Sequence, residues 1–550
     1  MSSPLPPLWA THAVFNQVPP LENCNLYARN APMREAMERT ADAGVVAALN
    51  ARGDELGSPR MQELARDANR NPPVLRSFDA TGRRRDEVEF HPAYHELMAY
   101  LKRHGVAAGP WANPRPGAHV ARAALFMMCA ELEDGTLCPT TMTYAAVPAI
   151  ARDRAIAAEW LPRILAPDYD ARFVPASEKR GVTLGMGMTE KQGGSDVRAN
   201  TTTAEPVGSR EYRIVGHKWF LSAPMSDAFL ILAQAPGGLS CFLLPRFTAE
   251  GEVNAVRIER LKDKLGDRSN ASSEVEFCGA RATLVGDEGR GVPIILEMGT
   301  YCRLDCALGT AGLMRQSIVQ AHHHARHRSA FGRRLADQPL MMNVLADLAL
   351  ESEAATVLAL RLAAAFDAGA DEQQSLLRRL LTPAAKFWVC KRGPMVAAEA
   401  MEVLGGSGYV EEGPLARIYR QMPLNSIWEG SGNVMCLDVL RAIARHPRCL
   451  DALVAEVAQA KGGDRRLDAF AQQLADELAR PECAEERARQ LASSIALVVQ
   501  GALLVRFAPG SVADAFCASR LSPSVQTRGV FGSLPDATDF RAIQERAWPA

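Results

Sequence analysis

A change of texture along the chain constrains the fold more than any other feature. Residues 186–290 contain short β-type runs that Gly and Pro residues separate, whereas the regions on either side carry helical patterns. The runs lie at residues 212–215, 228–233, 239–244, 255–261 and 274–277. No helical pattern alternates with them, which argues against a parallel, doubly wound sheet and predicts a compact antiparallel β domain.

Helical patterns occupy the rest of the chain. Residues 118–133 are rich in Ala, Leu and Met, and Leu340, Val344 and Leu348 repeat at the four-residue spacing of one apolar helix face. The fold class that we predict is α+β, mainly α, with a helical domain, a β domain, a helical bundle and an extra helical module. We place these domains at residues 1–185, 186–290, 291–446 and 447–550.

Composition places the chain among ordinary soluble proteins. Of its 550 residues, 47% are hydrophobic and 23% are charged, and the formal net charge of −1 gives no overall attraction to nucleic acid or membranes. Twelve cysteines without a Cys-x-x-Cys pair predict a reduced, cytoplasmic chain. The N-terminus lacks the pattern of a signal peptide, and the longest nearly apolar stretch, residues 492–505, is shorter than the ~20 residues of a membrane span.

The string at residues 186–195, Met-Gly-Met-Thr-Glu-Lys-Gln-Gly-Gly-Ser, is the most specific motif of the chain. Thr189 and Ser195 supply hydroxyls that can bind a polar ligand, and Gly193 and Gly194 let the backbone approach such a ligand closely. A glycine-rich turn alone would be weak evidence, but the complete string is far more specific. No Gly-x-Gly-x-x-Gly follows a strand, so a nicotinamide cofactor is not supported.

Four further strings accompany this motif. Residues 216–222 read Gly-His-Lys-Trp-Phe-Leu-Ser, and residues 328–332 read Arg-Ser-Ala-Phe-Gly with Gln338 following. Residues 402–409 read Glu-Val-Leu-Gly-Gly-Ser-Gly-Tyr, and residues 428–433 read Trp-Glu-Gly-Ser-Gly-Asn. Together the five strings resemble the flavin site of the acyl-CoA dehydrogenase superfamily. The long N-terminal part, the wording of the motifs and the extra C-terminal module look most like its AidB branch, flavoproteins associated with the bacterial response to DNA alkylation.

The resemblance covers essentially the whole chain and implies FAD as the cofactor. It places Phe220 and Ser222 against the flavin ring, and Arg328 against the FAD pyrophosphate of a neighbouring subunit, a task that suits the planar guanidinium fork. A cofactor shared in this way requires an oligomer, and the family norm is a homotetramer. Most relatives carry Gln where this chain has Glu402. The implied cofactor-binding residues are Met186, Met188, Thr189, Gly194, Ser195, Phe220, Leu221, Ser222, Arg328, Phe331, Gln338, Gly405, Gly406, Ile427, Trp428, Gly430, Ser431 and Asn433.

Glu429 is the candidate catalytic residue. Oxidation of an acyl-CoA needs a carboxylate that removes the proton α to the thioester, and burial adapts a carboxylate to this task by raising its pKa. Glu429 matches the family position for that base, and its backbone N–H is expected to polarise the thioester oxygen. The structural alternative is a glutamate that caps a helix before Gly430. Some relatives keep the base just before a retained Arg, but here Cys302 precedes Arg303 and is not a plausible base.

Histidines near the FAD motif are not predicted to bind a metal. His323 and His327 share a helix face at a spacing that can bind zinc, but no His-Glu-x-x-His pattern accompanies them. They lie on the helix that leads into Arg328. We interpret them as a solvated or interface cluster.

Two functions follow from the resemblance. The first is binding and protection of duplex DNA during alkylation, or inactivation of alkylating agents, with weak dehydrogenase activity on isovaleryl-CoA-like substrates. The second is a genuine short- or branched-chain acyl-CoA dehydrogenase without a DNA role. A flavin-bearing protein without turnover is a third interpretation. Residues 445–550 contain 13 Lys and Arg and 13 Asp and Glu, so this module gives DNA binding little support. A local basic stripe remains open, built from Arg465, Arg466, Arg487, Arg489, Arg506, Arg520 and Arg528.

Overall fold

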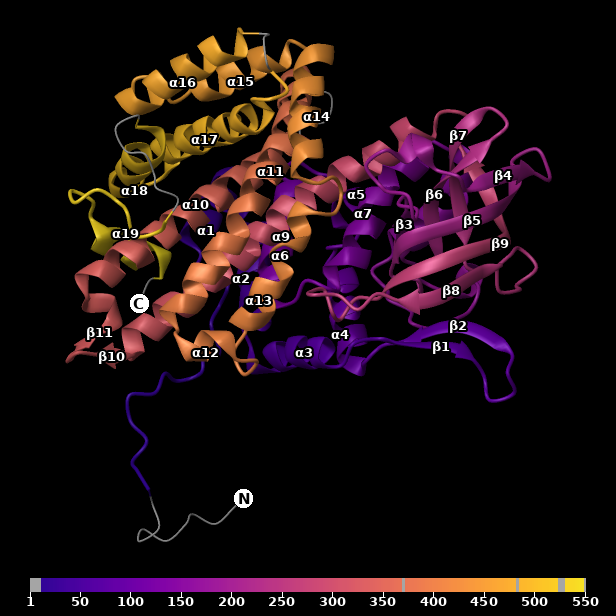
Figure 1. Ribbon diagram of the computed structural model, residues 1–550, viewed down its shortest axis with the longest axis horizontal. Coiled ribbons are helices and arrows are strands. Elements are labelled where there is room, and N and C mark those ends of the chain that lie inside the picture. The colour runs from indigo at the N-terminus through magenta and orange to yellow at the C-terminus, as the bar shows by residue number, and fades with distance from the viewer. Residues whose placement is uncertain (1–10, 368–370, 481–483, 523–529, 549–550) are drawn as a thin grey trace.

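Three helical regions and one β domain make up the computed structural model, which describes residues 11–367, 371–480, 484–522 and 530–548 (Figure 1). The predicted class, mainly α with a β-rich middle domain, is confirmed. The β domain lies to one side of a central bundle of long helices, and the last helices of the chain pack on the other side of that bundle.

The N-terminal region consists of helices and one hairpin. Its elements are α1 (Ala31–Thr40), α2 (Ala43–Leu56), α3 (Pro59–Arg70), β1 (Val74–Phe78), β2 (Arg84–Glu89), α4 (Pro92–Arg103), α5 (Gly109–Ala112), α6 (Ala118–Leu132), α7 (Leu137–Ala151) and α8 (Arg154–Ile164). The side chains of Asn30, Asp42 and Ser58 each accept a hydrogen bond from a backbone N–H in the first turn of the helix that follows, which explains where α1, α2 and α3 begin. The hairpin of β1 and β2 reaches toward the β domain (Figure 1).

The middle domain is a seven-stranded sheet that closes on itself. Its strands are β3 (Leu184–Gly187), β4 (Thr203–Pro206), β5 (Glu211–Ser222), β6 (Ala228–Ala235), β7 (Gly238–Pro245), β8 (Val256–Leu261) and β9 (Ser272–Val285). Strand β6 pairs with β7 along one edge and with β3 and β4 along the other, so a barrel forms from β6, β4, β5, β9 and β7. The pairing is antiparallel except where β3 and β4 run parallel to β6. The expectation of a purely antiparallel domain is corrected in this respect.

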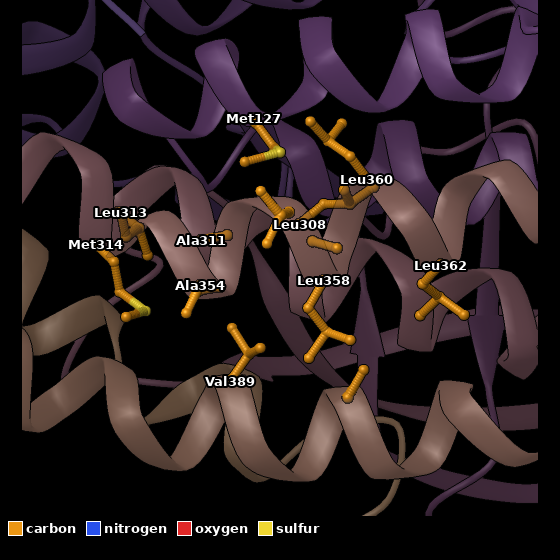
Figure 2. Close-up of a cluster of buried hydrophobic side chains, with 14 of the residues drawn as sticks. Met127, Leu308, Ala311, Leu313, Met314, Ala354, Leu358, Leu360, Leu362 and Val389 are labelled. Carbon is orange, nitrogen blue, oxygen red and sulfur yellow. The ribbon is translucent and has the colours of Figure 1, made fainter. Parts of the chain in front are cut away.

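The central bundle contains the longest helices of the protein. Its elements are α9 (Gly291–His327), β10 (Ser329–Ala330), β11 (Arg333–Arg334), α10 (Pro339–Asp367), α11 (Glu372–Val403), α12 (Gly406–Tyr409), α13 (Leu415–Gln421) and α14 (Gly432–Arg445). Buried side chains of α6, α9, α10 and α11 interdigitate at its centre, as Figure 2 shows for Leu308 of α9, Leu358 of α10 and Val389 of α11. This core fixes the helices from which the site residues project.

The C-terminal helices share the core of the bundle. They are α15 (Cys449–Ala458), α16 (Arg465–Leu478), α17 (Ala488–Phe507), α18 (Gly510–Phe516) and α19 (Phe540–Ala547). Helix α17 packs on α10, α11 and α14, and its apolar residues belong to the same hydrophobic cluster as those of α9 and α10. It has the length and composition of a membrane span, the one such helix in the described part of the chain, but it is mostly buried inside the protein.

Candidate functional site

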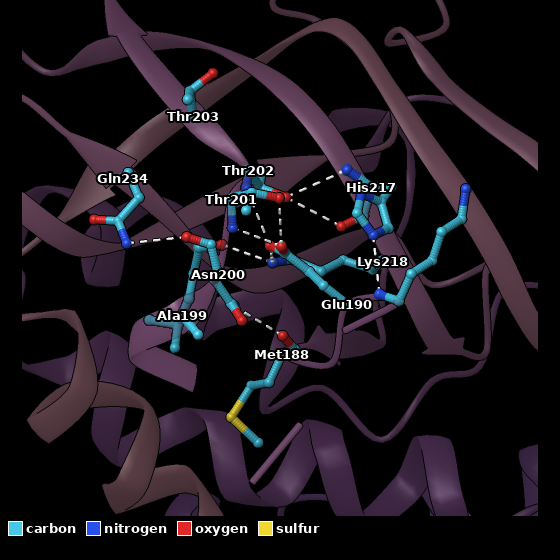
Figure 3. Close-up of polar contacts among 12 residues, drawn as sticks. Met188, Glu190, Ala199, Asn200, Thr201, Thr202, Thr203, His217, Lys218 and Gln234 are labelled. Atoms are coloured by element: carbon cyan, nitrogen blue, oxygen red, sulfur yellow. Dashed lines mark hydrogen bonds and ion pairs between the residues drawn. The ribbon is translucent and has the colours of Figure 1, made fainter. Parts of the chain in front are cut away.

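The motif at residues 186–195 forms the end of β3 and the loop that follows, and a buried ion pair anchors this loop (Figure 3). Lys218 of β5 lies 2.8 Å from the carboxylate of Glu190, and neither side chain is exposed. The backbone N–H groups of Thr201 and Thr202 donate to the same carboxylate at 2.7 and 3.2 Å. Burial alone would raise the pKa of Glu190, but the hydrogen bonds from Lys218 and Thr201 outweigh it and hold this pKa well below its usual range.

The anchored loop presents the two predicted hydroxyls. A β carbon at position 194 would lie 2.3 Å from Thr189 Oγ1, so this close approach requires Gly194. Asn200 Nδ2 donates to the carbonyl of Met188 at 3.0 Å and holds the opposite side of the loop (Figure 3). Ser195 is exposed, and the hydroxyls of Thr189 and Ser195 have no hydrogen-bond partner within the described residues. Both groups are therefore available to a ligand.

Strand β5 places the second motif beside this loop. Leu221 is fully buried in the barrel core, so Phe220 and Ser222 lie on the opposite face of the strand. The Phe220 ring is 48% exposed and lies 4.5 Å from Lys262 Nζ. The hydroxyl of Ser222 lies 3.3 Å from that of Ser272. This face offers an exposed aromatic ring and a hydroxyl two positions later, as the sequence predicts.

The candidate base lies in a short loop between α13 and α14. Lys386 of α11 donates from Nζ to the carbonyls of Trp428 and Gly430, at 2.6 Å in each case. Arg303 of α9 donates from Nε to the carbonyl of Glu429 at 3.0 Å. The backbone of Glu429 is left-handed, with a φ of 58°, and Gly430 has a φ of 103°. Two cations thus hold three successive carbonyls of this loop.

The side chain of Glu429 points toward α9. A β carbon on Gly299 would lie 3.8 Å from Glu429 Oε2, so the carboxylate lies at contact distance from α9. Burial raises the pKa of Glu429, and the positive charges of Arg303 and Lys386 oppose that rise. Helix α14 begins after Ser431, and no side chain caps it, so the alternative in which Glu429 caps this helix is not observed. The carboxylate has the environment that a general base requires.

Hydrophobic contacts join the flavin motif to the Glu429 loop. Met186, Met188 and Trp428 belong to one apolar cluster, together with Cys138 of α7 and Cys302 of α9. These residues come from the β domain, the N-terminal helices and the bundle, so three regions of the chain meet at the candidate base. The structure brings together the residues from Met186 to Ser222 and those from Ile427 to Asn433 as one group.

The edge of this group is partly exposed. Ile427 is 63% exposed and Ser431 is also exposed. Asn433 accepts a hydrogen bond through Oδ1 from Arg489 Nε of α17, at 2.8 Å. The C-terminal helices therefore contact the cofactor motif directly, a connection that the sequence did not suggest.

The other predicted cofactor residues form a second group at the far end of the bundle, where β10, β11 and α12 lie (Figure 1). Phe331, at the tip of the hairpin of β10 and β11, is 99% exposed and has a φ of 52°. Gly405 and Gly406 have open space where a β carbon would lie. Gln338 donates to the carbonyl of Ala330 at 3.0 Å and closes the hairpin.

Arg328 and the loop after α11 line one cavity of about 760 Å³. The guanidinium of Arg328 donates to the carbonyl of Asn16 at 2.5 Å, and the Asn16 side chain bonds to both backbone groups of Ser329. Glu131, Leu404 and the segment 17–22 complete much of the lining. The N-terminal segment thus holds Arg328 in place, which sequence reasoning missed because no pattern connects residues so far apart.

Sequence reasoning also missed the roles of three charged residues. Lys386 has no motif of its own, and Glu190 and Lys218 stand inside the quoted strings without a predicted partner. Their common signal is a charge within an otherwise apolar or glycine-rich stretch, since charges are seldom fully buried unless paired. His323 donates from Nε2 to the carbonyl of Pro19, and the ring of His327 lies 4.4 Å from that of His323. The described residues contain no cluster of three or more His, Cys, Asp or Glu side chains that could hold a metal ion.

A mainly helical protein with a β barrel beside a half-buried carboxylate and a flavin-type loop has the features of a flavin-dependent dehydrogenase. Matches to protein-family models support this class. Residues 16–171 match the N-terminal domain of the adaptive response protein AidB, residues 185–280 the middle domain of acyl-CoA dehydrogenases and residues 289–444 their C-terminal domain.

Relatives cover nearly the whole chain. The chain is 50% identical to AidB of Escherichia coli strain K12, over 92% of this chain and 94% of that protein. It is 31% identical to acyl-CoA dehydrogenase family member 11 of Caenorhabditis elegans, over 79% and 73% of the two chains. The crystal structure of C. elegans ACDH-11 in complex with C11-CoA superposes with a TM-score of 0.86 at 26% identity, over 96% of each chain. The chain therefore belongs to the acyl-CoA dehydrogenase family, in its AidB branch.

Membership of this family makes the chain an FAD-dependent oxidoreductase. The residues of the first group fit this cofactor. The hydroxyls of Thr189 and Ser195 have no protein partner within the described residues, and the exposed side chains of Phe220 and Ile427 would be covered by a flat, mostly apolar ring. The donor set and the apolar surface together match the polar edge and the faces of a flavin.

Proposed function

We propose that this protein dehydrogenates a short or branched acyl-CoA of the isovaleryl type, with Glu429 as the catalytic base. The observation that carries the proposal is the placement of Glu429, which is half-buried beside α9 in the loop that borders the flavin motif, where Arg303 of α9 and Lys386 of α11 bind the loop backbone. Burial keeps this carboxylate basic, and the cations keep it ionised often enough to act.

Two residues of the loop, Glu429 and Trp428, have roles in this reaction. Glu429 removes the proton from the carbon α to the thioester. Its backbone N–H donates to the thioester oxygen, where negative charge develops. Trp428 and the methionines of the shared apolar cluster exclude water from the carboxylate. FAD, when bound, supplies the acceptor for the hydride that leaves the β carbon.

The second group of cofactor residues supports an oligomeric enzyme. Arg328, Phe331, Gln338, Gly405 and Gly406 lie at the opposite end of the bundle from Glu429 (Figure 1). We propose that they bind the pyrophosphate and adenine end of FAD from a neighbouring subunit in a homotetramer. The exposed ring of Phe331 and the open space beside the glycines favour this arrangement, because a single chain leaves them uncovered.

The test of the proposal compares wild-type protein with Glu429→Gln. Each FAD-loaded protein is mixed with isovaleryl-CoA without oxygen, and the loss of flavin absorbance is followed. We expect the rate to fall by about 10²- to 10⁴-fold while the FAD content stays unchanged. Glu252→Gln makes the same chemical change at an exposed position of the β domain and should reduce flavin at the wild-type rate. Unaltered reduction in Glu429→Gln would refute the assignment.

A second candidate function is cytoplasmic duplex-DNA binding and protection in the response to alkylation. The 50% identity to E. coli AidB and the match to the adaptive response domain support it. The charges of the C-terminal helices do not support DNA binding. Arg466, Arg506 and Arg520 form ion pairs with acidic side chains, and Arg520 is buried between Asp347 and Glu351.

The remaining candidates for a basic stripe are few. Arg487 binds backbone carbonyls and Arg489 binds Asn433. Arg528 lies outside the described residues. Arg465 is exposed and has no partner within the described part of the chain. Since DNA binding depends on the neutralisation of phosphates, this arrangement favours the dehydrogenase as the first function.

Fluorescence anisotropy with duplex DNA tests the second candidate across a salt series. The full-length protein is required, because α17 shares the core of the bundle and its removal would expose apolar surface. Micromolar or tighter binding that weakens steeply with salt would support a DNA role, and Arg465→Glu should then reduce the salt dependence. An absence of binding at low salt would contradict it.

A further inference from the structure

The backbone at Glu429 is left-handed, and two cations bind the carbonyls on and around this residue. Here the carbonyls of Trp428 and Gly430 both point to Lys386, and the carbonyl between them points to Arg303. The φ of 58° at Glu429 lies in the left-handed region, which is unfavourable for a non-glycine residue. Such a conformation persists only where its surroundings fix it.

Lys386 is the better placed of the two cations to fix this shape. Its side chain is 1% exposed, and its two hydrogen bonds are short and charge-assisted. Arg303 makes one contact to the loop and is itself held by Asp438, which Arg379 also binds. The ammonium of Lys386 therefore binds the peptide group that precedes Glu429 and the peptide group that follows Gly430.

The consequence concerns the direction of the Glu429 N–H. A trans peptide places its N–H opposite its C=O, so the contact of Lys386 with the Trp428 carbonyl turns the N–H of Glu429 away from α11. That N–H has no acceptor within the described residues. We propose that Lys386 is a positioning residue, which orients the N–H and the carboxylate of Glu429 toward the same thioester. This inference rests on the proposed function of Glu429.

The charge of Lys386 adds a second effect. Burial raises the pKa of Glu429, and the charges of Arg303 and Lys386 oppose that rise. The other titratable groups that face the carboxylate are the thiols of Cys138, Cys302 and Cys306. Burial raises the pKa of all three thiols, so they stay neutral. Loss of Lys386 therefore raises the pKa of Glu429. As a result, a higher pH is needed to ionise the carboxylate that acts as the base.

The test compares Lys386→Met with Lys102→Met. Lys102 of α4 is a matched control, since it is 3% exposed and its Nζ also donates to two backbone carbonyls, those of Ile164 and Val182, at 2.9 and 3.2 Å. Each FAD-loaded variant is mixed with isovaleryl-CoA across pH and substrate concentration, and flavin reduction is followed. Thermal unfolding and FAD content are measured in parallel.

A positioning role predicts a specific pattern. In Lys386→Met the limiting rate of flavin reduction falls by about 100-fold, because a misplaced base loses the geometry of attack. The apparent affinity for isovaleryl-CoA changes little, and the rising limb of the pH profile moves to higher pH. Lys102→Met loses comparable thermal stability but keeps the wild-type rate and pH profile. Lys386→Arg, which retains the charge, recovers part of the rate and the original pH limb.

Two results separate failure of this inference from failure of the proposed function. If Lys386→Met and Lys102→Met show the same rate and the same pH profile, Lys386 is merely structural. If Glu429→Gln still reduces flavin, the proposed function fails whatever Lys386 does. Should Lys386→Met not fold, Lys386→Gln must show the shifted pH limb, since its amide can still donate to one carbonyl but carries no charge. A wild-type pH profile in that variant would equally overturn the inference.

Discussion

The two groups of cofactor residues differ in how completely one chain satisfies them. Around Glu190 and Glu429, the buried cations Lys218 and Lys386 bind the Glu190 carboxylate and the carbonyls of the Glu429 loop, and the two loops share one apolar cluster. Around Arg328, the Phe331 ring is almost fully exposed and the cavity floor contains Glu131, whose Oε1 has no partner within the described residues. Buried contacts within the chain support the loops of the first group, whereas the second group is largely exposed.

The difference indicates which half of the site can form when a single chain folds without a ligand or a partner. A loop that buries its own ion pairs is as stable as the domain around it, and it holds its ligand groups in place before any ligand arrives. An exposed aromatic ring, and glycines with empty space beside them, make no stabilising contacts until another surface covers them. We therefore expect changes in the first group to reduce the stability of the chain, and changes in the second to reduce cofactor retention and assembly.

The largest expected effect comes from breaking the ion pair beneath the flavin motif. Lys218→Met leaves the carboxylate of Glu190 buried without its cation, which should cost about 3–5 kcal/mol in the free energy of unfolding. Urea denaturation of the apo-protein measures this loss. The double variant Glu190→Gln with Lys218→Met removes both charges and should recover much of it. Equal stability of Lys218→Met and wild type would show that the loop does not depend on this pair.

Replacement of Arg328 should affect the cofactor rather than the stability of the chain. Loss of a charge-assisted hydrogen bond to a phosphate costs about 1.5–3 kcal/mol, so Arg328→Gln should weaken FAD binding by roughly 10- to 100-fold. Equilibrium titration of the apo-protein with FAD, followed by flavin fluorescence, measures this change. Arg333→Gln, in the same hairpin and exposed, is the matched control and should bind FAD as the wild type does. If both variants bind FAD normally, the second group has no part in the cofactor site.

Much of the first group could be predicted from sequence because its chemistry is local. The contact of Thr189 with Gly194 lies within one string, and the exclusion of Cys302 as the base followed from its position before Arg303. The order of helical and β regions was also readable from composition and periodicity, since these depend on nearest neighbours along the chain.

The supports of the site could not be predicted in this way. Lys386 reaches the Glu429 loop across more than forty residues, and Glu190 meets Lys218 only because β3 and β5 belong to the same sheet. The parallel pairing of β3 with β6 is likewise a product of the tertiary fold. Sequence patterns indicate which face of an element is buried, but not which distant charge will meet it there.

The smallest expected effect tests the unpaired carboxyl of the second group. Burial raises the pKa of Glu131 to about 8, and Arg315 only partly opposes this. The folded chain therefore holds this proton up to about pH 8, whereas the unfolded chain releases it near the ordinary value of 4.5. The stability that protonated Glu131 contributes is complete below pH 4.5 and is lost as pH rises toward 8.

Glu131→Gln removes this titration while it keeps the shape of the side chain. Between pH 6 and 7, the free energy of unfolding of the wild type should fall relative to that of the variant by up to about 1.4 kcal/mol. Urea denaturation of the apo-protein at each pH measures the difference. Parallel pH dependence of the two proteins would mean that Glu131 is already paired or solvated. The same experiment with FAD bound shows whether a ligand in the cavity changes the protonation of Glu131. A change would show that the cofactor reaches the second group of residues.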